Sequence, residues 1–387
     1  MINVLFVDDD ANILQAMRRL LHPLRRDWSC WYAQSGPEAL AVLAEQPVDV
    51  IVTDMRMPWM DGAELLTEVR DRYPEIIRII LSGYSEKDSA MRSLTAAHQY
   101  LSKPCEPEVL QNTIERVFSL RGILNNDALR TFVAKIPNIP SLPHLYSALL
   151  DELGRPEPST PKVAGIIRQD PGMTAKLLQI VNSAFFSLKR RVSDVKEAID
   201  LLGLETIGAL TFGLGIISQF EAAPGAEKRL GELWSHCLEV GARARKIARR
   251  YAPSAAADSF TAGLLHDVGE FLLAVNLPDE FDRVKKMKIE EEMTTMEAEQ
   301  RVLGATHAEV GAYLLGLWGL PRQVVEAVAY HHEPERTGLE GFSAVTAVHI
   351  ADALDNQKRA GRPPHFDAAY LSRLGLPATA ESWIDAV

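Results

Sequence analysis

The chain begins with the apolar run Ile2-Asn3-Val4-Leu5-Phe6-Val7 and continues directly with Asp8-Asp9-Asp10. A short apolar run that ends in polar residues is typical of a buried β-strand. Four similar runs follow, separated by amphipathic helical patterns: Trp28–Ala33, Val48–Thr53, Ile76–Leu81 and Gln99–Leu101. Strands that alternate with helices predict an α/β domain with a five-stranded parallel sheet and helices on both faces.

Polar side chains stand at the ends of these runs. Asp54 follows the third run, Ser82 ends the fourth, and Lys103 follows the fifth. Because the carboxyl ends of parallel strands lie at one edge of a sheet, we expect these side chains to converge with the first aspartates. Clustered carboxylates need a cation, and Mg²⁺ suits such a site. One carboxylate beside Mg²⁺ and a lysine can act as a nucleophile toward a phosphoryl group.

The same residues resemble the receiver domains of two-component response regulators, which have a flavodoxin-like α/β fold. The resemblance covers roughly residues 1–120. It is carried by Val7-Asp8-Asp9, Thr53-Asp54-Met55-Arg56-Met57-Pro58, Asp61-Gly62, Leu81-Ser82-Gly83 and Tyr100-Leu101-Ser102-Lys103-Pro104.

The resemblance implies a phosphorylation site and a magnesium site. Asp54 is the expected phosphoacceptor for a sensor histidine kinase and also lies beside the ion. Asp9 is expected to bind Mg²⁺ directly, Asp8 through water, and Arg56 through its backbone carbonyl.

The resemblance also implies residues that respond to phosphorylation. Lys103 is expected to contact the phosphoryl group, and Ser82 to hydrogen-bond it. Tyr100 is then expected to move inward as a switch. The bond between Lys103 and Pro104 is expected to be cis, as in the family. Asp10 precedes a helical pattern and fits as its N-cap.

Length and composition limit what the rest of the chain can be. The 387 residues predict two or three domains, and the formal net charge of -11 argues against nucleic acid as a partner. Cys30, Cys105 and Cys237 form neither a disulfide framework nor a zinc-finger spacing. No apolar run reaches the roughly 18 residues of a membrane span, and no basic leader precedes the first strand. We therefore expect a cytoplasmic protein without membrane contact.

Strand patterns end after the first third of the chain, and helical periodicity punctuated by prolines continues from Leu129. We predict a receiver over residues 1–120 and a helical linker over 121–130, into which the last receiver helix extends. An all-α output domain follows over 131–355, and an extension of unassigned function over 356–387.

The helical part resembles the HD superfamily, and more closely its HDOD branch (HD-related output domain), over roughly residues 130–335. Most members of this branch are described as signalling or scaffold domains without demonstrated catalysis. Besides the histidine motifs, the resemblance is carried by Ile136-Pro137, Pro140-Ser141-Leu142-Pro143, Ile167–Thr174, Leu177–Phe186, Ala198–Leu204 and Trp318-Gly319-Leu320-Pro321.

The histidines of this part point to a metal site. HD hydrolases use a histidine, a His-Asp pair and a later aspartate, and His236, His266-Asp267 and Asp352 fit that order. Cyclic-di-GMP phosphodiesterases of the HD-GYP type add further histidines, whose positions are matched by His307, His331 and His332. Imidazoles and carboxylates are ligands of Fe, Mn, Ni or Zn, which can activate a water for attack on phosphorus.

Two features of the HD-GYP type are missing. Glu270 stands at the place of the usual lysine after the His-Asp pair, and Pro334–Gly338 at the place of the Gly-Tyr-Pro segment. The metal ligands of the HD-GYP type can therefore be present without the substrate groove of that type. Two interpretations stay open: a metal centre, or buried histidines that satisfy carbonyls and one another. For His349 alone, the structural interpretation is the better one.

Two functions are compatible with this sequence. In the first, phosphorylation changes the interface of the receiver with the helical domain or with a second copy in a homodimer. The helical domain then binds a downstream protein or a cyclic dinucleotide. In the second, phosphorylation gates a metal-dependent phosphohydrolase that acts on a cyclic dinucleotide.

We do not expect DNA binding, although two basic stretches are present. Lys189-Arg190-Arg191 precedes a helix–Gly–helix pattern over Val195–Leu210, but the HDOD resemblance explains that pattern. The second stretch, Arg243–Arg250, fits one solvated helix face.

Overall fold

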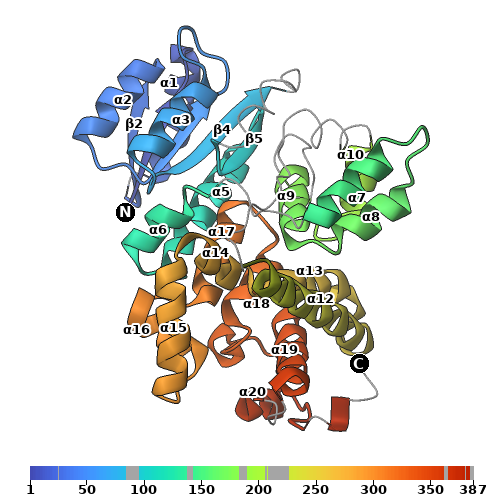
Figure 1. Cartoon of the computed structure of the whole chain (residues 1–387). Helices are drawn as coiled ribbons and strands as arrows, with labels where there is room; N and C mark the ends of the chain where they lie inside the picture. The colour runs from blue at the N-terminus through green and yellow to red at the C-terminus, as the bar shows by residue number, and fades with distance from the viewer. Residues whose placement is uncertain are drawn as a thin grey trace. The chain divides into compact units, whose positions relative to one another are not determined.

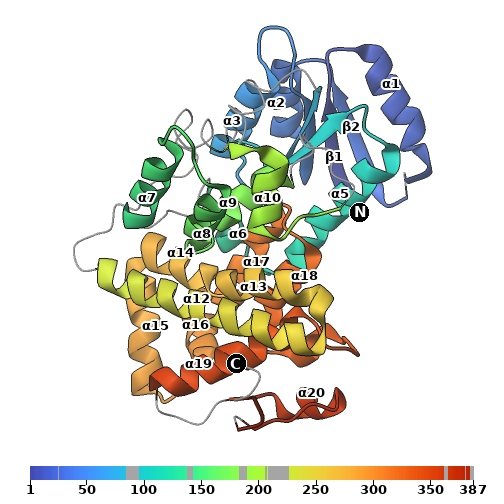
Figure 2. The same cartoon turned by 90° about the vertical axis from the view of Figure 1, so that its right-hand side faces the viewer.

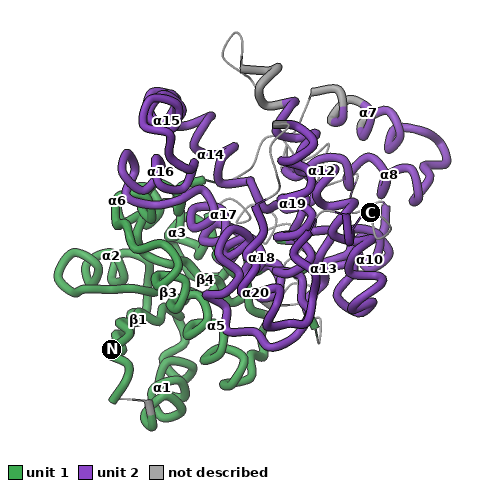
Figure 3. The backbone as a smooth tube through the Cα atoms, turned by 90° about the horizontal axis from the view of Figure 1, so that it is seen from below, with its two compact units in different colours: residues 1–137, 179–190, 317–319 green, residues 138–178, 191–316, 320–387 purple. Residues whose placement is uncertain are grey.

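The computed structural model describes residues 1–24, 26–83, 96–136, 143–182, 190–204, 207, 226–360, 365–379 and 381–383. The chain divides into two compact units (Figure 3). Unit 1 comprises residues 1–137, 179–190 and 317–319, and unit 2 comprises 138–178, 191–316 and 320–387. Within the described ranges, no helix is both long and apolar enough to cross a membrane.

Some motif residues named above lie outside the described residues. They are Pro137, Pro140-Ser141-Leu142, Ser183-Ala184-Phe185-Phe186, Lys189 and most of residues 205–210.

Unit 1 contains a five-stranded parallel sheet with the strand order β2-β1-β3-β4-β5. The strands are β1 (Ile2–Val7), β2 (Trp28–Ala33), β3 (Val50–Asp54), β4 (Ile77–Gly83) and β5 (Gln99–Lys103). This order is that of the flavodoxin-like fold, so the predicted α/β class is confirmed. The β3 strand begins two positions later than predicted, and β4 and β5 continue to Gly83 and Lys103.

Helices flank the strands, and α2 and α3 lie side by side (Figure 1). The described helices of the first 137 residues are α1 (Ala11–Leu20), η1 (His22–Leu24), α2 (Gly36–Glu45), α3 (Gly62–Arg72), α5 (Pro107–Ser119), η2 (Leu120–Gly122) and α6 (Asp127–Val133). The side chain of Asp10 accepts a hydrogen bond of 2.8 Å from the backbone N–H of Asn12, which confirms the predicted N-cap of α1.

The last receiver helix does not continue through the predicted linker. Helix α5 ends at Ser119, and α6 begins after Asn126, whose side chain accepts a hydrogen bond from the backbone N–H of Leu129. An asparagine is a strong helix N-cap, so it starts a new helix here. The connector is therefore two separate helical segments.

The described residues after 142 form helices joined by loops, with no strand among them, which confirms the all-α prediction. Helices α12, α13, α18 and α19 pack together (Figure 2). The helices are α7 (Pro143–Leu153), α8 (Thr160–Ile167), α9 (Pro171–Val181), α10 (Val195–Leu202), α12 (Ala226–Tyr251), η4 (Pro253–Ala255), α13 (Ala256–Leu265), α14 (Val268–Asn276), α15 (Pro278–Glu290), α16 (Thr295–Leu303), α17 (His307–Leu317), α18 (Arg322–Tyr330), η5 (Pro334–Thr337), α19 (Ala344–Ala360) and α20 (Ala368–Arg373).

Glycines allow two close approaches between helices of unit 2. A Cβ on Gly263 of α13 would lie 2.7 Å from the Cα of Gly241 in α12. A Cβ on Gly269 of α14 would lie 1.9 Å from the carbonyl oxygen of His307 at the start of α17. Any side chain at these positions would push the helices apart, and the helices that approach there carry the histidines of the predicted metal site.

The described part of the C-terminal extension packs against unit 2. The ring of Trp383 is buried and lies 5.3 Å from that of Tyr251, between centroids. The Tyr370 hydroxyl lies 2.7 Å from the hydroxyl of Thr346 on α19. Residues 365–379 and 381–383 therefore form part of the folded helical unit.

Candidate phosphorylation site and metal centre

The strand register of unit 1 brings three aspartates together. Asp8 follows β1 and Asp54 ends β3, while the pairing places Val7 beside Thr53 and Asp54 beside Leu81. Carboxylate oxygens of Asp8, Asp9 and Asp54 all lie within 4.8 Å of one another. Asp8 is buried and Asp9 is exposed, so this acidic edge is open to solvent on one side.

Lys103 at the end of β5 joins two of these carboxylates. Its Nζ lies 2.7 Å from Oδ2 of Asp8 and 2.7 Å from Oδ1 of Asp54. Burial disfavours charge on Lys103, but its hydrogen bonds to Asp54 and Asp8 outweigh burial and raise its pKa. Burial also raises the pKa of Asp54, and Lys103 opposes this shift. Lys103 is thus a fixed cation beside the predicted phosphoacceptor.

The loop after Asp54 is packed tightly onto the strand end. A Cβ on Gly62 would lie 2.1 Å from the carbonyl oxygen of Asp54, so only glycine fits there. The backbone N–H of Gly62 also donates a hydrogen bond of 2.9 Å to the carbonyl of Met55. This packing explains the Asp61-Gly62 motif, because it holds the loop against the acidic edge.

The remaining predicted receiver residues lie on β4 and β5 or directly after β3. Tyr100 on β5 is 4% exposed, so it already faces inward. Arg56 lies in the exposed loop after β3. Ser82 lies on β4, but its side chain is outside the described residues. The peptide bond between Lys103 and Pro104 is cis, as predicted.

The seven predicted metal-ligand residues of the helical unit lie in one cluster. They are His236 on α12, His266 and Asp267 between α13 and α14, His307 at the start of α17, His331 and His332 after α18, and Asp352 on α19. His266 lies one turn after Gly263, so the close approach at that glycine brings its ring to 5.0 Å from the ring of His236. Both predicted groups of ligands therefore converge from separate helices.

The first ligand set surrounds one oxygen of Asp267. Nε2 of His236 lies 3.5 Å, and Nε2 of His266 3.3 Å, from Oδ2 of Asp267. On the other side, the same two nitrogens lie 3.1 and 3.6 Å from Oδ1 of Asp352. His236, His266 and Asp267 thus lie within reach of one ion, and Asp352 lies within reach of one together with His266 and His331.

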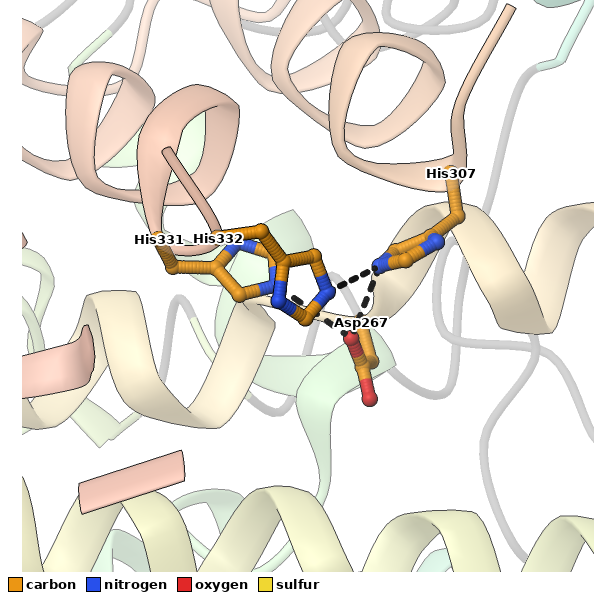
Figure 4. A group of neighbouring side chains, drawn as sticks. All are labelled: Asp267, His307, His331 and His332. Atoms are coloured by element: carbon orange, nitrogen blue, oxygen red, sulfur yellow. Dashed lines mark hydrogen bonds and ion pairs between the residues drawn. The ribbon is translucent and has the colours of Figure 1, made fainter. Parts of the chain in front are cut away.

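The second ligand set surrounds the other oxygen of Asp267 (Figure 4). Nε2 of His307 lies 3.3 Å, and Nε2 of His331 3.7 Å, from Oδ1 of Asp267. Nε2 of His332 lies 3.2 Å from Nε2 of His307. Asp267 therefore belongs to both sets, one oxygen to each.

Several ligand histidines are held by the ring nitrogen that faces away from the cluster. Nδ1 of His266 lies 2.7 Å from the carbonyl oxygen of Gly263, and Nδ1 of His331 lies 2.8 Å from that of Val328. A carbonyl oxygen can only accept, so Nδ1 carries a proton and Nε2 is the nitrogen that a metal ion would bind. Such partners fix the orientation of metal-binding histidines in known sites.

Carboxylates surround this cluster and change the pKa of its histidines. Burial disfavours charge on His236, but hydrogen bonds to Asp352 and Asp355 outweigh burial and raise its pKa to about 10. Burial likewise opposes charge on His307, but Glu299 and Asp267 raise its pKa well above the ordinary value. Protonated imidazoles thus balance the carboxylates, and metal cations would supply the same positive charge.

Two other histidines of the cluster, His331 and His332, favour their neutral forms. Burial and the neighbouring His332 hold the pKa of His331 well below its ordinary value. Burial and His307 lower the pKa of His332 to about 4. Nε2 of His331 is buried and has no hydrogen-bond partner among the described residues. A buried nitrogen with an unused lone pair that faces carboxylates fits a metal ligand better than a structural histidine.

Two carboxylates that were not predicted from the sequence contact these ligands. Asp355 accepts a hydrogen bond of 2.7 Å from Nδ1 of His236, and Glu299 one of 2.7 Å from Nδ1 of His307. Asp355 lies one turn after Asp352 on the same helix, a spacing that was visible in the sequence. Glu299 lies on α16, and nothing in its spacing from the ligands indicated contact.

His349 lies beside the cluster without belonging to either set. Its Nε2 accepts a hydrogen bond of 2.9 Å from the backbone N–H of Asp367. Its Nδ1 therefore carries the proton and donates a hydrogen bond of 2.7 Å to the carbonyl of His331. The structural interpretation of His349 is confirmed, and the residue joins the C-terminal extension to a predicted metal ligand.

Two protein families match the chain. The response regulator receiver domain matches residues 4–115, and the HDOD domain matches residues 139–334. Together they cover the strand-rich part of unit 1 and most of the helices described above.

Curated relatives match parts of the chain only. The hydrogenase transcriptional regulatory protein HoxA of Cupriavidus necator is 38% identical over 122 residues, which are 31% of this chain and 25% of that protein. An uncharacterised protein of Treponema pallidum is 27% identical over 199 residues, which are 51% of this chain and 38% of that protein. The chain thus spans well under half the length of both relatives.

Solved structures are similar at low levels of identity. The MmoQ response regulator of Methylococcus capsulatus is 23% identical, with 64% of this chain and 97% of that chain covered and a TM-score of 0.49. An HDOD domain protein of Geobacter sulfurreducens is 27% identical, with 70% and 86% covered and a TM-score of 0.39. From the family match over residues 139–334 and the receiver match before it, this chain belongs to the HDOD domain family and is a response regulator with an N-terminal receiver domain.

Proposed function

We propose that this response regulator takes a phosphoryl group on Asp54 and thereby controls a metal-dependent phosphodiester hydrolase in its HDOD domain. The observation that carries the hydrolase is Asp267, whose two oxygens face two separate sets of imidazole ligands. A carboxylate shared between two ligand sets is the arrangement of two-metal hydrolytic sites.

At the receiver, the phosphodonor is a phosphohistidine of a sensor histidine kinase. An oxygen of the Asp54 carboxylate attacks phosphorus, the P–N bond of the donor breaks, and the electron pair of that bond remains on the imidazole. Lys103 lies 2.7 Å from Oδ1 of Asp54 and can neutralise charge on the transferred group. Mg²⁺, held by Asp8, Asp9, Asp54 and the Arg56 carbonyl, would supply further neutralisation.

At the HDOD domain, His236, His266, Asp267 and Asp352 would hold one ion, and Asp267, His307, His331 and His332 the other. Iron, manganese, nickel or zinc suits ligand sets rich in imidazole. Bound ions would supply Lewis acidity and lower the pKa of a water molecule. The His332 side chain is 31% exposed, so one ligand of the second set reaches solvent.

A cyclic dinucleotide is the substrate class that we propose, since the additional histidines fit those of cyclic-di-GMP phosphodiesterases. Glu270 stands in place of the usual lysine, so the contact to the substrate phosphate would differ from that in HD-GYP phosphodiesterases. Burial, together with Asp267, raises the pKa of Glu270. A lysine would attract a phosphate oxygen, whereas a glutamate can bind one only when it is protonated and donates a hydrogen bond.

A second candidate is a domain that binds a cyclic dinucleotide or a downstream protein without hydrolysis. The absence of the lysine and of the Gly-Tyr-Pro segment favours this candidate. In both cases, phosphorylation would act through the interface of the receiver with the helical domain or within a homodimer.

The test is the metal content and phosphodiesterase activity of the full chain and its His266→Ala variant. We expect near-stoichiometric metal, hydrolysis of bis(p-nitrophenyl) phosphate and of one or more cyclic dinucleotides, and loss of both in the variant. Metal in the wild type without hydrolysis of any substrate would favour the binding domain. Absence of metal after reconstitution with Fe²⁺, Mn²⁺, Ni²⁺ and Zn²⁺ would overturn the metal centre itself.

A further inference from the structure

Two buried carboxylates accept hydrogen bonds from proposed metal-binding histidines, one carboxylate for each ligand set. Glu299 on α16 is 0% exposed, and its Oε2 accepts hydrogen bonds from both Nδ1 and the backbone N–H of His307, at 2.7 and 2.9 Å. Asp355 on α19 is 1% exposed, and its Oδ2 accepts a hydrogen bond of 2.7 Å from Nδ1 of His236.

The other ligand histidines with a hydrogen bond at Nδ1 use neutral partners. The carbonyl oxygens of Gly263 and Val328 accept from His266 and His331. Each ligand set therefore contains one histidine whose Nδ1 donates to a carboxylate and one whose Nδ1 donates to a backbone carbonyl. A carboxylate draws the Nδ1 proton more strongly than a carbonyl does, so it makes Nε2 a more basic metal ligand.

We propose that Glu299 and Asp355 are positioning residues, each of which sets the affinity of the centre for one of its two ions. Glu299 acts on the ion at His307, His331 and His332, and Asp355 acts on the ion at His236 and His266. This inference rests on the metal centre proposed above.

The two carboxylates differ in their ion pairs, and therefore in how strongly each attracts the Nδ1 proton of its histidine. The Nε of Arg359 lies 2.5 Å from Oδ2 of Asp355, and Arg243 lies 3.6 Å from its Oδ1. These guanidinium groups neutralise part of the charge on Asp355. No arginine or lysine of the described ranges forms an ion pair with Glu299, so no guanidinium or ammonium group there offsets its charge on His307. We therefore expect the Glu299 substitution to have the larger effect.

Glu299 also fixes the position of the His307 backbone, from which the imidazole extends toward the second ligand set. His307 is the first residue of α17, where the backbone N–H has no partner within the helix. Because one carboxylate oxygen binds both this N–H and Nδ1, it fixes the helix end and the ring together. The second oxygen of Glu299 is buried and has no hydrogen-bond partner in the described structure. A buried carboxylate whose partner is one histidine destabilises the fold unless that histidine is charged or bound to a cation.

The experiment titrates the metal-free full chain with Co²⁺, whose visible absorption reports each imidazole site. The Asp9→Asn substitution is present throughout, so that the receiver does not contribute a site. We expect two bound Co²⁺ ions in this parent protein. Glu299→Gln should weaken one of them about 10- to 100-fold and leave the other unchanged. Asp355→Asn should weaken the other ion by a smaller factor.

Double variants assign each effect to its ion and separate it from a general loss of structure. Glu299→Gln should have no effect on the remaining ion in a His307→Ala background, and Asp355→Asn none in a His236→Ala background. Glu297→Gln is the matched control, because Glu297 is an exposed capping residue on the same helix. It should bind both ions as the parent does.

The possible outcomes distinguish this inference from the proposed function. If the parent binds two ions and both carboxylate variants bind them with unchanged affinity, the positioning roles are wrong and the metal centre stands. The same conclusion holds if either variant weakens both ions equally. If the parent binds no Co²⁺, the proposed metal centre fails, and the positioning roles fail with it.

Discussion

Arg78 donates a hydrogen bond of 2.8 Å to the carbonyl oxygen of Ala134, which follows helix α6. The guanidinium is buried in unit 1, and it also donates to the carbonyls of Ala96, Pro74 and Ile76. Arg78 thereby joins β4, the strand that carries Ser82, to the helical segment that follows the receiver helices. Any movement of β4 would therefore act on that segment through a direct contact.

Replacement of Arg78 by methionine should loosen α6. The change leaves buried carbonyls without donors, so the free energy of unfolding should fall by about 2 to 4 kcal/mol. Hydrogen exchange of the full chain, followed by mass spectrometry, should become faster in residues 127–134. Arg72→Met is the control, because Arg72 is 60% exposed and, among the residues that the structure describes, forms an ion pair with Glu68 on the same helix alone. Equal exchange in both variants would contradict the role of Arg78.

The neighbouring His98 should make unit 1 sensitive to acid. Its Nδ1 accepts a hydrogen bond from the backbone N–H of Arg78, and burial and the charge of Arg78 hold its pKa well below the ordinary 6.5. The unfolded chain then binds a proton that the folded chain does not. The contribution of neutral His98 to the free energy of unfolding is fully present above pH ~6.5. It falls by about 1.4 kcal/mol for each pH unit below that value.

The measurement for His98 is urea unfolding of the wild type and a His98→Asn variant between pH 7.5 and pH 5.5. The variant lacks the titrating group, so its stability should fall less with acid than that of the wild type. Parallel pH profiles would show that His98 is protonated in the folded protein.

Asp9 and Asp10 are adjacent acidic residues with different predicted roles. Asp9→Asn should slow phosphorylation of Asp54 by phosphoramidate about 100-fold, because an expected magnesium ligand is lost. Asp10→Asn should retain the wild-type rate, since asparagine serves equally well as an N-cap. The rate is followed by intact-protein mass spectrometry at saturating Mg²⁺. An equal loss in both variants would argue for general electrostatics rather than a specific ligand.

Gly269→Ala should damage the second ligand set. The new Cβ would lie 1.9 Å from the carbonyl oxygen of His307, so α14 and α17 must separate. We expect about 1 to 3 kcal/mol of destabilisation and loss of one bound ion per chain, from thermal unfolding and elemental analysis. Gly165→Ala on α8 meets no atom within 4 Å and should instead stabilise the protein by about 0.5 to 1 kcal/mol.

His349→Ala should weaken metal binding, although His349 is not a ligand. The substitution removes the hydrogen bond that holds the carbonyl of His331, and we expect a loss of about 10-fold in Co²⁺ affinity. His365→Ala is the control, because His365 is exposed on the extension. An unchanged affinity in His349→Ala would mean that α18 alone positions His331.

The two halves of the chain differed in what could be predicted. The sheet and its acidic edge followed from short apolar runs and from the geometry of parallel strands, which places Asp8, Asp54 and Lys103 together whatever the loops do. The ligand cluster was predicted through a resemblance, because histidines on separate helices meet only when the helices pack. Glu299 looked like any charge on a helix surface, and its burial against His307 depends on how α16 meets α17. In the sequence, Arg78 is a charged residue within an apolar strand. Its hydrogen bonds to Ala96 and Ala134 could not be predicted, because they depend on how distant segments pack.

The ligands of the two sets come from helices that are distant in sequence, and His236 meets Asp355 across 119 positions. Ions bound there would cross-link the helices, and the free energy of metal binding would count toward folding. In a metal-starved cell, the helices would open more often, and proteases degrade open forms. The lifetime of the protein would then depend on the supply of the metal, independently of any signal that reaches Asp54.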